Sequence, residues 1–212
     1  MSKKRLYDQN CSLAFALDTI GDRWTVLIIR DLLPGPRSFT TLASDLKGIG
    51  TNLLTSRLKE LLAADIVTKK SLTPGSKTKL WALTDQGREL EPIVIQLAQW
   101  GLRHLSNRYS DENHWSPLWN YVACKARFSP KKSIGLRTNG TFEIDSYSYW
   151  IEVQDGSFSF HEGSRPDGDF DLCCTAEEFK GFLSGSLDPN EFAKTSVSGD
   201  RAMFFRCVQC FI

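Results

Sequence analysis

The sequence predicts an α+β protein built from two domains of different composition. Residues 1–108 carry 16 Lys and Arg against 10 Asp and Glu, whereas residues 109–212 carry 10 against 15. Apolar residues recur at helical spacing through much of the first half and alternate with polar residues in the second. We therefore expect a basic, mostly helical domain over residues 1–108, a polar linker over 109–117, and an acidic α+β domain over 118–212.

The composition limits the classes of protein to which this chain can belong. With 212 residues, 41% of them hydrophobic, the chain can bury a core. No apolar run approaches the ~18 residues of a membrane span, and none follows the basic N-terminus as in a signal peptide. We expect a cytoplasmic protein without membrane contact, whose six cysteines form no structural disulfides. We find no nucleophile–base pair, phosphate loop or paired carboxylates, so we expect neither an enzyme nor a cofactor.

The first half begins with short helices. Residues 12–20 form an apolar stripe, and Asp22 is expected to cap a second helix that ends before Pro34. Further helices are expected over residues 39–46 and 52–62, around a turn at 48–50. The side chains expected to face inward in the second and fourth helices are Trp24, Leu27, Ile28, Leu32, Leu54, Leu58, Leu61 and Leu62.

Two β-type runs, residues 66–72 and 79–83, flank a Pro-Gly turn that carries lysines. Thr84 is expected to cap a long helix that reaches about residue 108, with Pro92 kinking it or splitting off its first turn. Ile93, Leu97 and Trp100 form the apolar seam of that helix. Two helices around a tight turn, followed by a basic hairpin, are a device for reading duplex DNA.

The polar face of the helix at 52–62 is the predicted interface. Amide and hydroxyl groups can read base edges in the major groove, while cations suit phosphates. A solvated helix face and a generic charged hairpin are the alternatives, and Lys69 and Lys70 add to the predicted phosphate contacts of the hairpin. The predicted DNA-binding residues are Arg37, Thr51, Asn52, Thr55, Ser56, Arg57, Lys59, Lys77 and Lys79.

The second half alternates with period two at residues 142–145, 149–153 and 157–161, which predicts half-buried strands. Asn139-Gly140 and Asp155-Gly156 are hairpin signals. The remaining expected elements are a helix opened by a capping box at Thr175–Glu178, a helix opened by Asp188-Pro189, a short strand at Val197, and a final helix from Asp200 to Ile212.

Four strings follow one another in the first half: CSLAFALDTIGDRWTVLIIRDLL from residue 11, GPRSF from 35, IGTNLLTSRLKEL from 49 and LTDQGREL from 83. With Pro92 and Trp100 they resemble the HxlR family of winged-helix regulators over about residues 6–105. The resemblance implies a DNA-binding homodimer formed through the first and last helices of the domain. Gly50 stands where the family often has a capping serine, and Asp65 replaces a usual glycine.

The second half carries Asp169-Phe-Asp-Leu-Cys, Ser184-Gly-Ser-Leu-Asp-Pro and Val197-Ser-Gly-Asp. These strings are similar to the sterol carrier protein-like (lipid-transfer) domain that follows the winged helix in some family members. The resemblance implies a twisted antiparallel sheet with helices over an apolar cavity. A solid aromatic core is the alternative. The residues expected to line a cavity are Phe142, Tyr149, Phe158, Phe160, Phe179, Phe182 and Phe204.

The cysteines are the last candidates for a functional site. Cys11 precedes a helix N-terminus, which lowers thiol pKa, and some members of the resembled family use this cysteine as a redox sensor. A buried cysteine that acts as a small hydrophobe is the alternative. Cys173 and Cys174 point to opposite faces of a strand, and Cys207 and Cys210 fit an amphipathic helix, so we expect no metal site.

The sequence thus favours a homodimeric transcriptional regulator of a pseudo-palindromic double-stranded DNA site, with a C-terminal domain for a small apolar effector. An apolar-ligand or lipid carrier, and a thiol switch acting through Cys11, are the alternatives.

Overall fold

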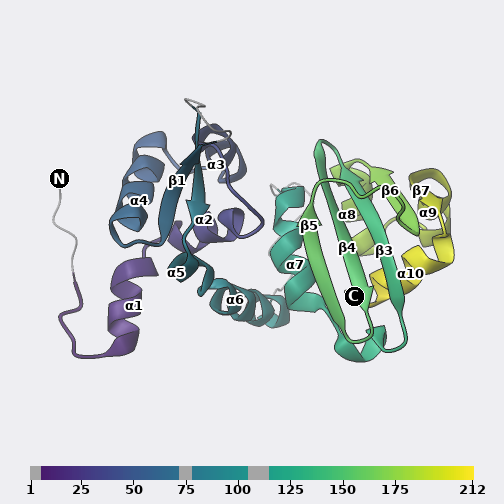
Figure 1. The fold of residues 1–212 in the computed structure, drawn as a ribbon, viewed down its shortest axis with the longest axis horizontal. Coiled ribbons are helices and arrows are strands. Elements are labelled where there is room, and N and C mark those ends of the chain that lie inside the picture. The colour runs from purple at the N-terminus through teal and green to yellow at the C-terminus, as the bar shows by residue number, and fades with distance from the viewer. Residues whose placement is uncertain (1–5, 72–77, 105–114) are drawn as a thin grey trace. The chain divides into compact units, whose positions relative to one another are not determined.

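The computed structural model describes residues 6–71, 78–104 and 115–212 (Figure 1). The chain forms two compact units, residues 1–94 and 95–212, which we describe separately. The elements of the first half are α1 (Ser12–Ile20), α2 (Thr25–Leu32), α3 (Phe39–Asp45), α4 (Thr51–Ala63), β1 (Val67–Ser71), β2 (Lys79–Leu83), α5 (Asp85–Arg88) and α6 (Glu91–His104).

The core of the first unit lies among α2, α3, α4 and the β1–β2 hairpin. Five side chains that were predicted to face inward are fully or nearly fully buried: Ile28, Leu32, Leu54, Leu58 and Leu61. Ile29 and Leu42, which were not predicted, are fully buried beside them. Leu27 and Leu62, which were expected to face inward, are 39% and 41% exposed. Both predictions are wrong because the buried stripe of each helix is narrower than the apolar pattern in its sequence.

The start of α2 also differs from the prediction. Its N-cap is Trp24, whose backbone is left-handed at φ 80° and which gives no side-chain cap. Asp22 was expected to cap this helix, but its carboxylate pairs with Arg57 of α4 instead. Without a capping side chain, the backbone itself makes the turn: the Thr25 N–H donates to the Asp22 carbonyl.

The connection after β2 agrees with two predictions from the sequence, the cap at Thr84 and the break at Pro92. Thr84 caps α5 by accepting from the Gly87 N–H at 3.0 Å, and its own hydroxyl donates to the Asp65 carbonyl. α6 begins afresh at Glu91, so Pro92 does separate a first turn from the long helix. A Cβ at Gly87 would lie 2.1 Å from the Ile66 carbonyl oxygen, so the close approach of α5 to β1 requires glycine.

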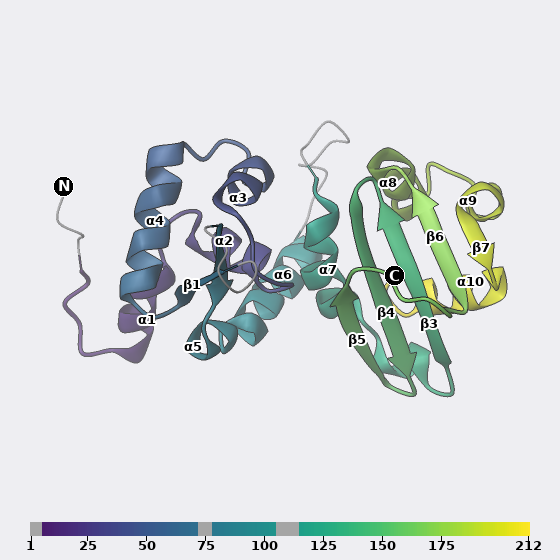
Figure 2. The ribbon, with the colours of Figure 1, turned by 45° about the horizontal axis from the view of Figure 1, so that its top comes forward.

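The second unit holds a five-stranded sheet with helices against one face. Figure 2 shows β3, β4, β5 and β6 side by side, and α8 and α10 lie behind the sheet in Figure 1. The elements of the second half are η1 (Pro117–Trp119), α7 (Asn120–Arg127), η2 (Pro130–Ser133), β3 (Arg137–Ile144), β4 (Tyr147–Gln154), β5 (Ser157–Glu162), β6 (Phe170–Cys174), α8 (Ala176–Ser184), α9 (Pro189–Ser196), β7 (Val197–Gly199) and α10 (Arg201–Gln209).

The strand order is β5-β4-β3-β6-β7. The expected all-antiparallel sheet is wrong in one pair, because β6 runs parallel to β3, with Phe142 opposite Leu172. The chain returns from the far edge strand β5 to the other side of β3, and that return aligns β6 with β3. Alternate residues of the strands and the inner faces of α8, α9 and α10 form one aromatic-rich core.

One predicted hairpin turn is wrong. Asn139-Gly140 lies inside β3, and the turn to β4 is made at Asp145, whose φ is 53°. Gly140 is needed for packing, since a Cβ there would lie 2.2 Å from the ring of Phe170. The second predicted turn, Asp155-Gly156, does connect β4 to β5.

The local helix signals of this unit are confirmed. Thr175 and Glu178 form the capping box of α8, Asp188 accepts from two N–H groups of α9, and Asp200 caps α10. Helix α7 was not predicted; its N-cap, Trp119, gives no side-chain cap. Among the residues that the structure describes, no helix has both the length and the apolar character needed to cross a membrane.

Candidate nucleic-acid interface

Helices α3 and α4 form the helix-turn-helix. Ser38 caps α3 by accepting from the Thr41 N–H at 3.0 Å, and α4 starts after Gly50, which gives no side-chain cap. Leu54 and Leu58 are fully buried and hold α4 against the domain. The absence of a side chain at Gly50 leaves the first N–H groups of α4 open to a phosphate, as at other helix N-termini.

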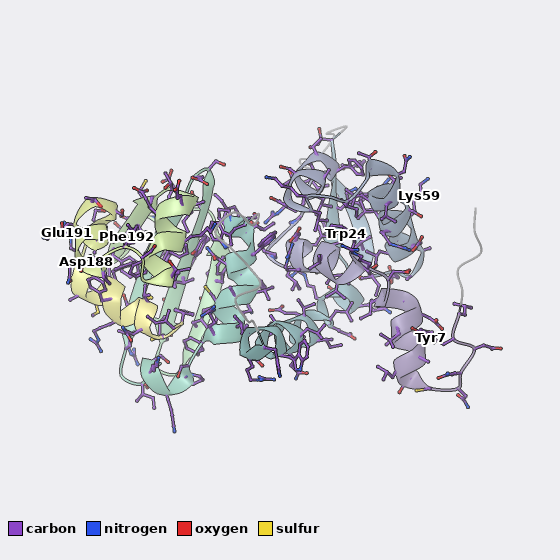
Figure 3. The ribbon with its side chains drawn as sticks, turned by 180° about the vertical axis from the view of Figure 1, so that it is seen from behind. Tyr7, Trp24, Lys59, Asp188, Glu191 and Phe192 are labelled. Carbon is purple, nitrogen blue, oxygen red and sulfur yellow. The ribbon has the colours of Figure 1, made fainter. Side chains whose placement is uncertain are left out.

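The opposite face of α4 is polar and exposed. Thr55 donates its hydroxyl to the Thr51 carbonyl at 2.8 Å, and Ser56 donates to Glu60 at 3.0 Å. Asn52 and Lys59 are exposed and have no hydrogen-bond partner among the described residues. Figure 3 shows Lys59 on the outer side of α4. This face therefore offers an amide and an ammonium group that a ligand can use directly.

Arg57 occupies a different environment from its neighbours. Its Nη1 lies 2.8 Å from Asp22 Oδ2 and also pairs with Glu60, and its side chain is only 19% exposed. The guanidinium therefore joins α4 to the α1–α2 connection. Arg57 is thus held by a side chain 35 residues earlier in the chain, a partner that the sequence does not reveal.

The hairpin β1–β2 forms the wing. Its register pairs Lys69 with Trp81, and the Lys69 ammonium lies 4.7 Å from the centre of the Trp81 ring. Lys79 donates to Ser71 Oγ at 2.8 Å across the hairpin. Lys70 is exposed, whereas Lys77 lies outside the described residues.

Arg37 adds a bridge to the wing. Its N–H donates to the Trp81 carbonyl at 2.8 Å, and its carbonyl accepts from the Trp81 N–H at 2.7 Å. The connection between α2 and α3 therefore lies along β2. This backbone pairing ties the wing to the helix-turn-helix.

Two helices outside this interface expose apolar side chains. On α1, Leu13 and Leu17 of the predicted apolar stripe are 65% and 39% exposed. On α6, the predicted seam of Ile93, Leu97 and Trp100 is also exposed. Large apolar side chains that recur on one helix face and remain exposed in a single chain are typical of a protein interface.

Cys11 is exposed at the N-cap of α1. The backbone N–H groups of Ala14 and Leu13, at the start of α1, lower the pKa of its thiol. Cys207 is buried, and burial raises the pKa of its thiol, as it raises that of Cys124 to about 12. Among the described residues, no three His, Cys, Asp or Glu side chains are arranged to hold a metal ion.

The second unit contains a cavity of about 190 Å³ between α7, α8, α10 and the sheet. Four of the seven residues predicted to line a cavity do so: Phe142, Tyr149, Phe179 and Phe182. The other three are packed elsewhere. Phe158 contacts Phe128 and Phe211, Phe160 stacks on Tyr149, and Phe204 is fully buried against Phe170. Sequence reasoning missed Asn120 and Cys124, which lie on the unpredicted helix α7.

The geometry of α3, α4 and the wing defines a winged helix-turn-helix DNA-binding protein. A family model described as HxlR-like helix-turn-helix matches residues 19–109. The chain is 33% identical over 101 residues to the uncharacterized HTH-type transcriptional regulator YybR of Bacillus subtilis, covering 47% of this chain and 81% of YybR. It is 30% identical to a second regulator of that organism, YvaP, covering 45% of this chain and 89% of YvaP.

The chain is also similar in sequence to chains of solved structures. The chain is 31% identical to PA1607, described as a putative transcription factor, with coverage of 51% and 73% of the two chains and a TM-score of 0.44. It is 30% identical to the redox regulator HypR in its reduced form, with coverage of 46% and 96% and a TM-score of 0.43. The chain belongs to the HxlR-like helix-turn-helix family, and it is a transcriptional regulator with a helix-turn-helix DNA-binding domain.

Proposed function

We propose that this regulator reads its operator with the outer face of α4. The observation that carries the proposal is the contrast along that helix: Asn52 and Lys59 are exposed and unpartnered among the described residues, whereas Arg57 is held by Asp22. The Asn52 amide suits the two hydrogen-bonding groups of an adenine edge, and Lys59 suits a phosphate. Thr51, Thr55 and Ser56 complete the surface with methyl and hydroxyl groups.

The wing supplies the second part of the proposed interface. Lys69, Lys70 and Lys79 lie on its two strands, and Lys77 belongs to the same hairpin in the sequence. Arg37 stands beside β2 through its backbone bridge. These cations would lie along the phosphate backbone, where each neutralised phosphate adds to the salt dependence of binding.

We propose further that the protein acts as a homodimer on a pseudo-palindromic operator. Support comes from the exposed apolar residues of α1 and α6, the helices that the family resemblance assigns to dimerisation. Two recognition helices in successive major grooves would be separated by about 34 Å. Leu97→Asp should turn the dimer into a monomer in sedimentation experiments and weaken operator binding, while Lys131→Asp, at an exposed site of η2, should change neither.

The second domain is proposed to bind a small apolar effector. The cavity between α7, α8 and the sheet supports this proposal, as does the resemblance to a lipid-transfer domain. A carrier protein is the alternative in which this domain is the functional part. Native mass spectrometry separates the two: a co-purified apolar molecule together with no specific DNA affinity would favour the carrier.

Operator binding is tested on DNA upstream of the protein's own gene and on random genomic fragments, across a range of salt concentrations. We expect Asn52→Ala to weaken specific binding by about 1–3 kcal/mol and to relax specificity at one base pair. Lys131→Ala serves as the control for an alanine substitution at an exposed site away from α4. If the native chain binds no fragment in preference to random DNA, operator recognition by this protein is refuted.

A thiol switch through Cys11 is the second candidate function. Its support is that Cys11 is exposed and that helix N–H groups lower the pKa of its thiol, which favours the reactive thiolate. Cys11→Ser should abolish oxidant-dependent release from DNA. Cys173→Ser, at another exposed cysteine, should leave the release intact. An unchanged response of Cys11→Ser rules the switch out.

A further inference from the structure

The cavity of the second unit is small and largely apolar. Its volume is about 190 Å³, and its walls include Phe142 and Tyr149 from the sheet and Phe179 and Phe182 from α8. An apolar cavity of roughly 150 Å³ accommodates benzene, whereas sites for drug-sized ligands span about 300–1,000 Å³. The cavity therefore suits a molecule of about one aromatic ring.

One pair of polar side chains lies in this apolar wall. The Asn120 amide of α7 donates to the Tyr149 hydroxyl of β4 at 3.1 Å, and both side chains are buried. The Tyr149 oxygen thus acts as an acceptor, and its own O–H proton remains to be donated. Among the described residues no acceptor for that proton is present, although both residues line the cavity.

The inner part of the cavity carries no formal charge. Burial raises the pKa of Tyr149 well above its ordinary value and that of Cys124 to about 12, so both stay protonated at neutral pH. Arg127 and Ile212, the last residue of the sequence, also line the cavity, but both are exposed. A charged group placed deep in such a site would lose its hydration without a buried counter-charge.

We propose that this cavity binds a neutral molecule of about one ring that carries an acceptor oxygen, and that the Tyr149 hydroxyl donates to that oxygen. The proposal rests on the proposed effector role of the second domain and specifies its ligand class. Asn120 orients the hydroxyl by occupying its acceptor side. Phe142, Phe179 and Phe182 supply aromatic contact surfaces. The Tyr149 ring is itself stacked between Phe142 and Phe160, so this residue offers the ligand its hydroxyl.

The test uses two probes of nearly equal shape with the full chain. Acetophenone has an acceptor oxygen, and ethylbenzene lacks one. We expect both to bind saturably in ligand-observed NMR, with acetophenone roughly three- to tenfold tighter, the range of one net hydrogen bond. Tyr149→Phe keeps the ring and removes the donor, so it should reduce acetophenone affinity to that of ethylbenzene and leave ethylbenzene unchanged.

Tyr147→Phe is the matched control. Tyr147 lies two residues earlier in the sequence on the same strand, its hydroxyl donates to Glu162 at 2.8 Å, and it does not line the cavity. It should leave the affinities of both probes unchanged. Because the comparison of the two probes is made first on the native chain, the proposal stays testable even if Tyr149→Phe folds poorly.

Three outcomes would overturn the proposal: no saturable binding of either probe, equal affinities of the two probes for the native chain, or tighter binding of benzoate or a long-chain fatty acid than of acetophenone. Operator binding is measured on the same samples. Specific DNA binding without probe binding refutes only the ligand assignment, whereas probe binding without specific DNA binding refutes only the regulator's operator recognition.

Discussion

Arg57 and Lys59 lie two residues apart on α4, and the structure predicts opposite consequences of replacing them by alanine. Arg57 pairs with Asp22 and Glu60, whereas Lys59 is exposed on the face proposed to meet DNA. We expect Arg57→Ala to destabilise the first unit without removing a phosphate contact. We expect Lys59→Ala to remove a phosphate contact without changing stability.

The size of the stability loss expected for Arg57→Ala follows from how exposed its two carboxylate partners are. Asp22 and Glu60 are 34% and 37% exposed, so solvent screens both pairs and each contributes only about 0.2–1 kcal/mol. The aliphatic part of Arg57 adds packing, since its side chain is 19% exposed. A total loss of about 1 kcal/mol should lower the Tm of a 60–100-residue domain by roughly 4–8 °C. Lys59→Ala should stay within about 0.5 kcal/mol of the native chain.

The assays are calorimetry of the full chain and operator binding across salt. The slope of log affinity against log salt should fall by about 1 for Lys59→Ala and stay at the native value for Arg57→Ala. A reduced slope for Arg57→Ala with an unchanged Tm would refute the structural assignment. It would mean that Arg57 leaves Asp22 to contact a phosphate.

Three further predictions concern the folding of the two units. Gly140→Ala should lower the free energy of unfolding, measured in urea, by about 1–3 kcal/mol because its Cβ would meet the buried Phe170 ring. The same substitution should cost less in a Phe170→Leu background, and equal costs in the two backgrounds would contradict the clash. Thr175→Ala should cost about 1 kcal/mol in the same assay by removing the capping box of α8, and no loss would argue against that cap. Burial raises the pKa of the Asp31 carboxyl, so the free energy of unfolding of the native chain should fall as pH rises from the unfolded-state pKa to the folded-state pKa. The stability of Asp31→Asn relative to the native chain should therefore be greater at about pH 7 than at about pH 4. An equal difference at both pH values would contradict this prediction.

Features set by neighbouring residues were predictable from the sequence. The caps at Thr84, Thr175 and Asp188, and the break at Pro92, each depend on contacts within one helical turn. The helix-turn-helix and the wing were predictable for the same reason, because apolar spacing and turn residues mark both. The exposed face of α4 followed from the helical period alone.

Features set by distant residues were not predictable. Asn139-Gly140 has the composition of a hairpin turn, yet its glycine is required by Phe170, a residue of β6 thirty positions later in the sequence. Arg57 looks like its neighbours until Asp22, 35 residues away, takes its guanidinium. The cavity depends on the unpredicted helix α7. That helix has no capping side chain at its N-terminus, so the signal that marks α5, α8 and α9 in the sequence is missing there.

The small size of the cavity limits how an effector could control DNA binding. A ligand shifts an equilibrium between two arrangements only by the ratio of its affinities for them. If the hydrogen bond to Tyr149 formed in one arrangement alone, its three- to tenfold contribution would change operator affinity by at most that factor through this contact. A larger response would require the ligand's apolar contacts with Phe142 and α8 to differ as well. Comparing the operator shift caused by acetophenone with that caused by ethylbenzene therefore separates the hydrogen bond from apolar filling as the source of regulation.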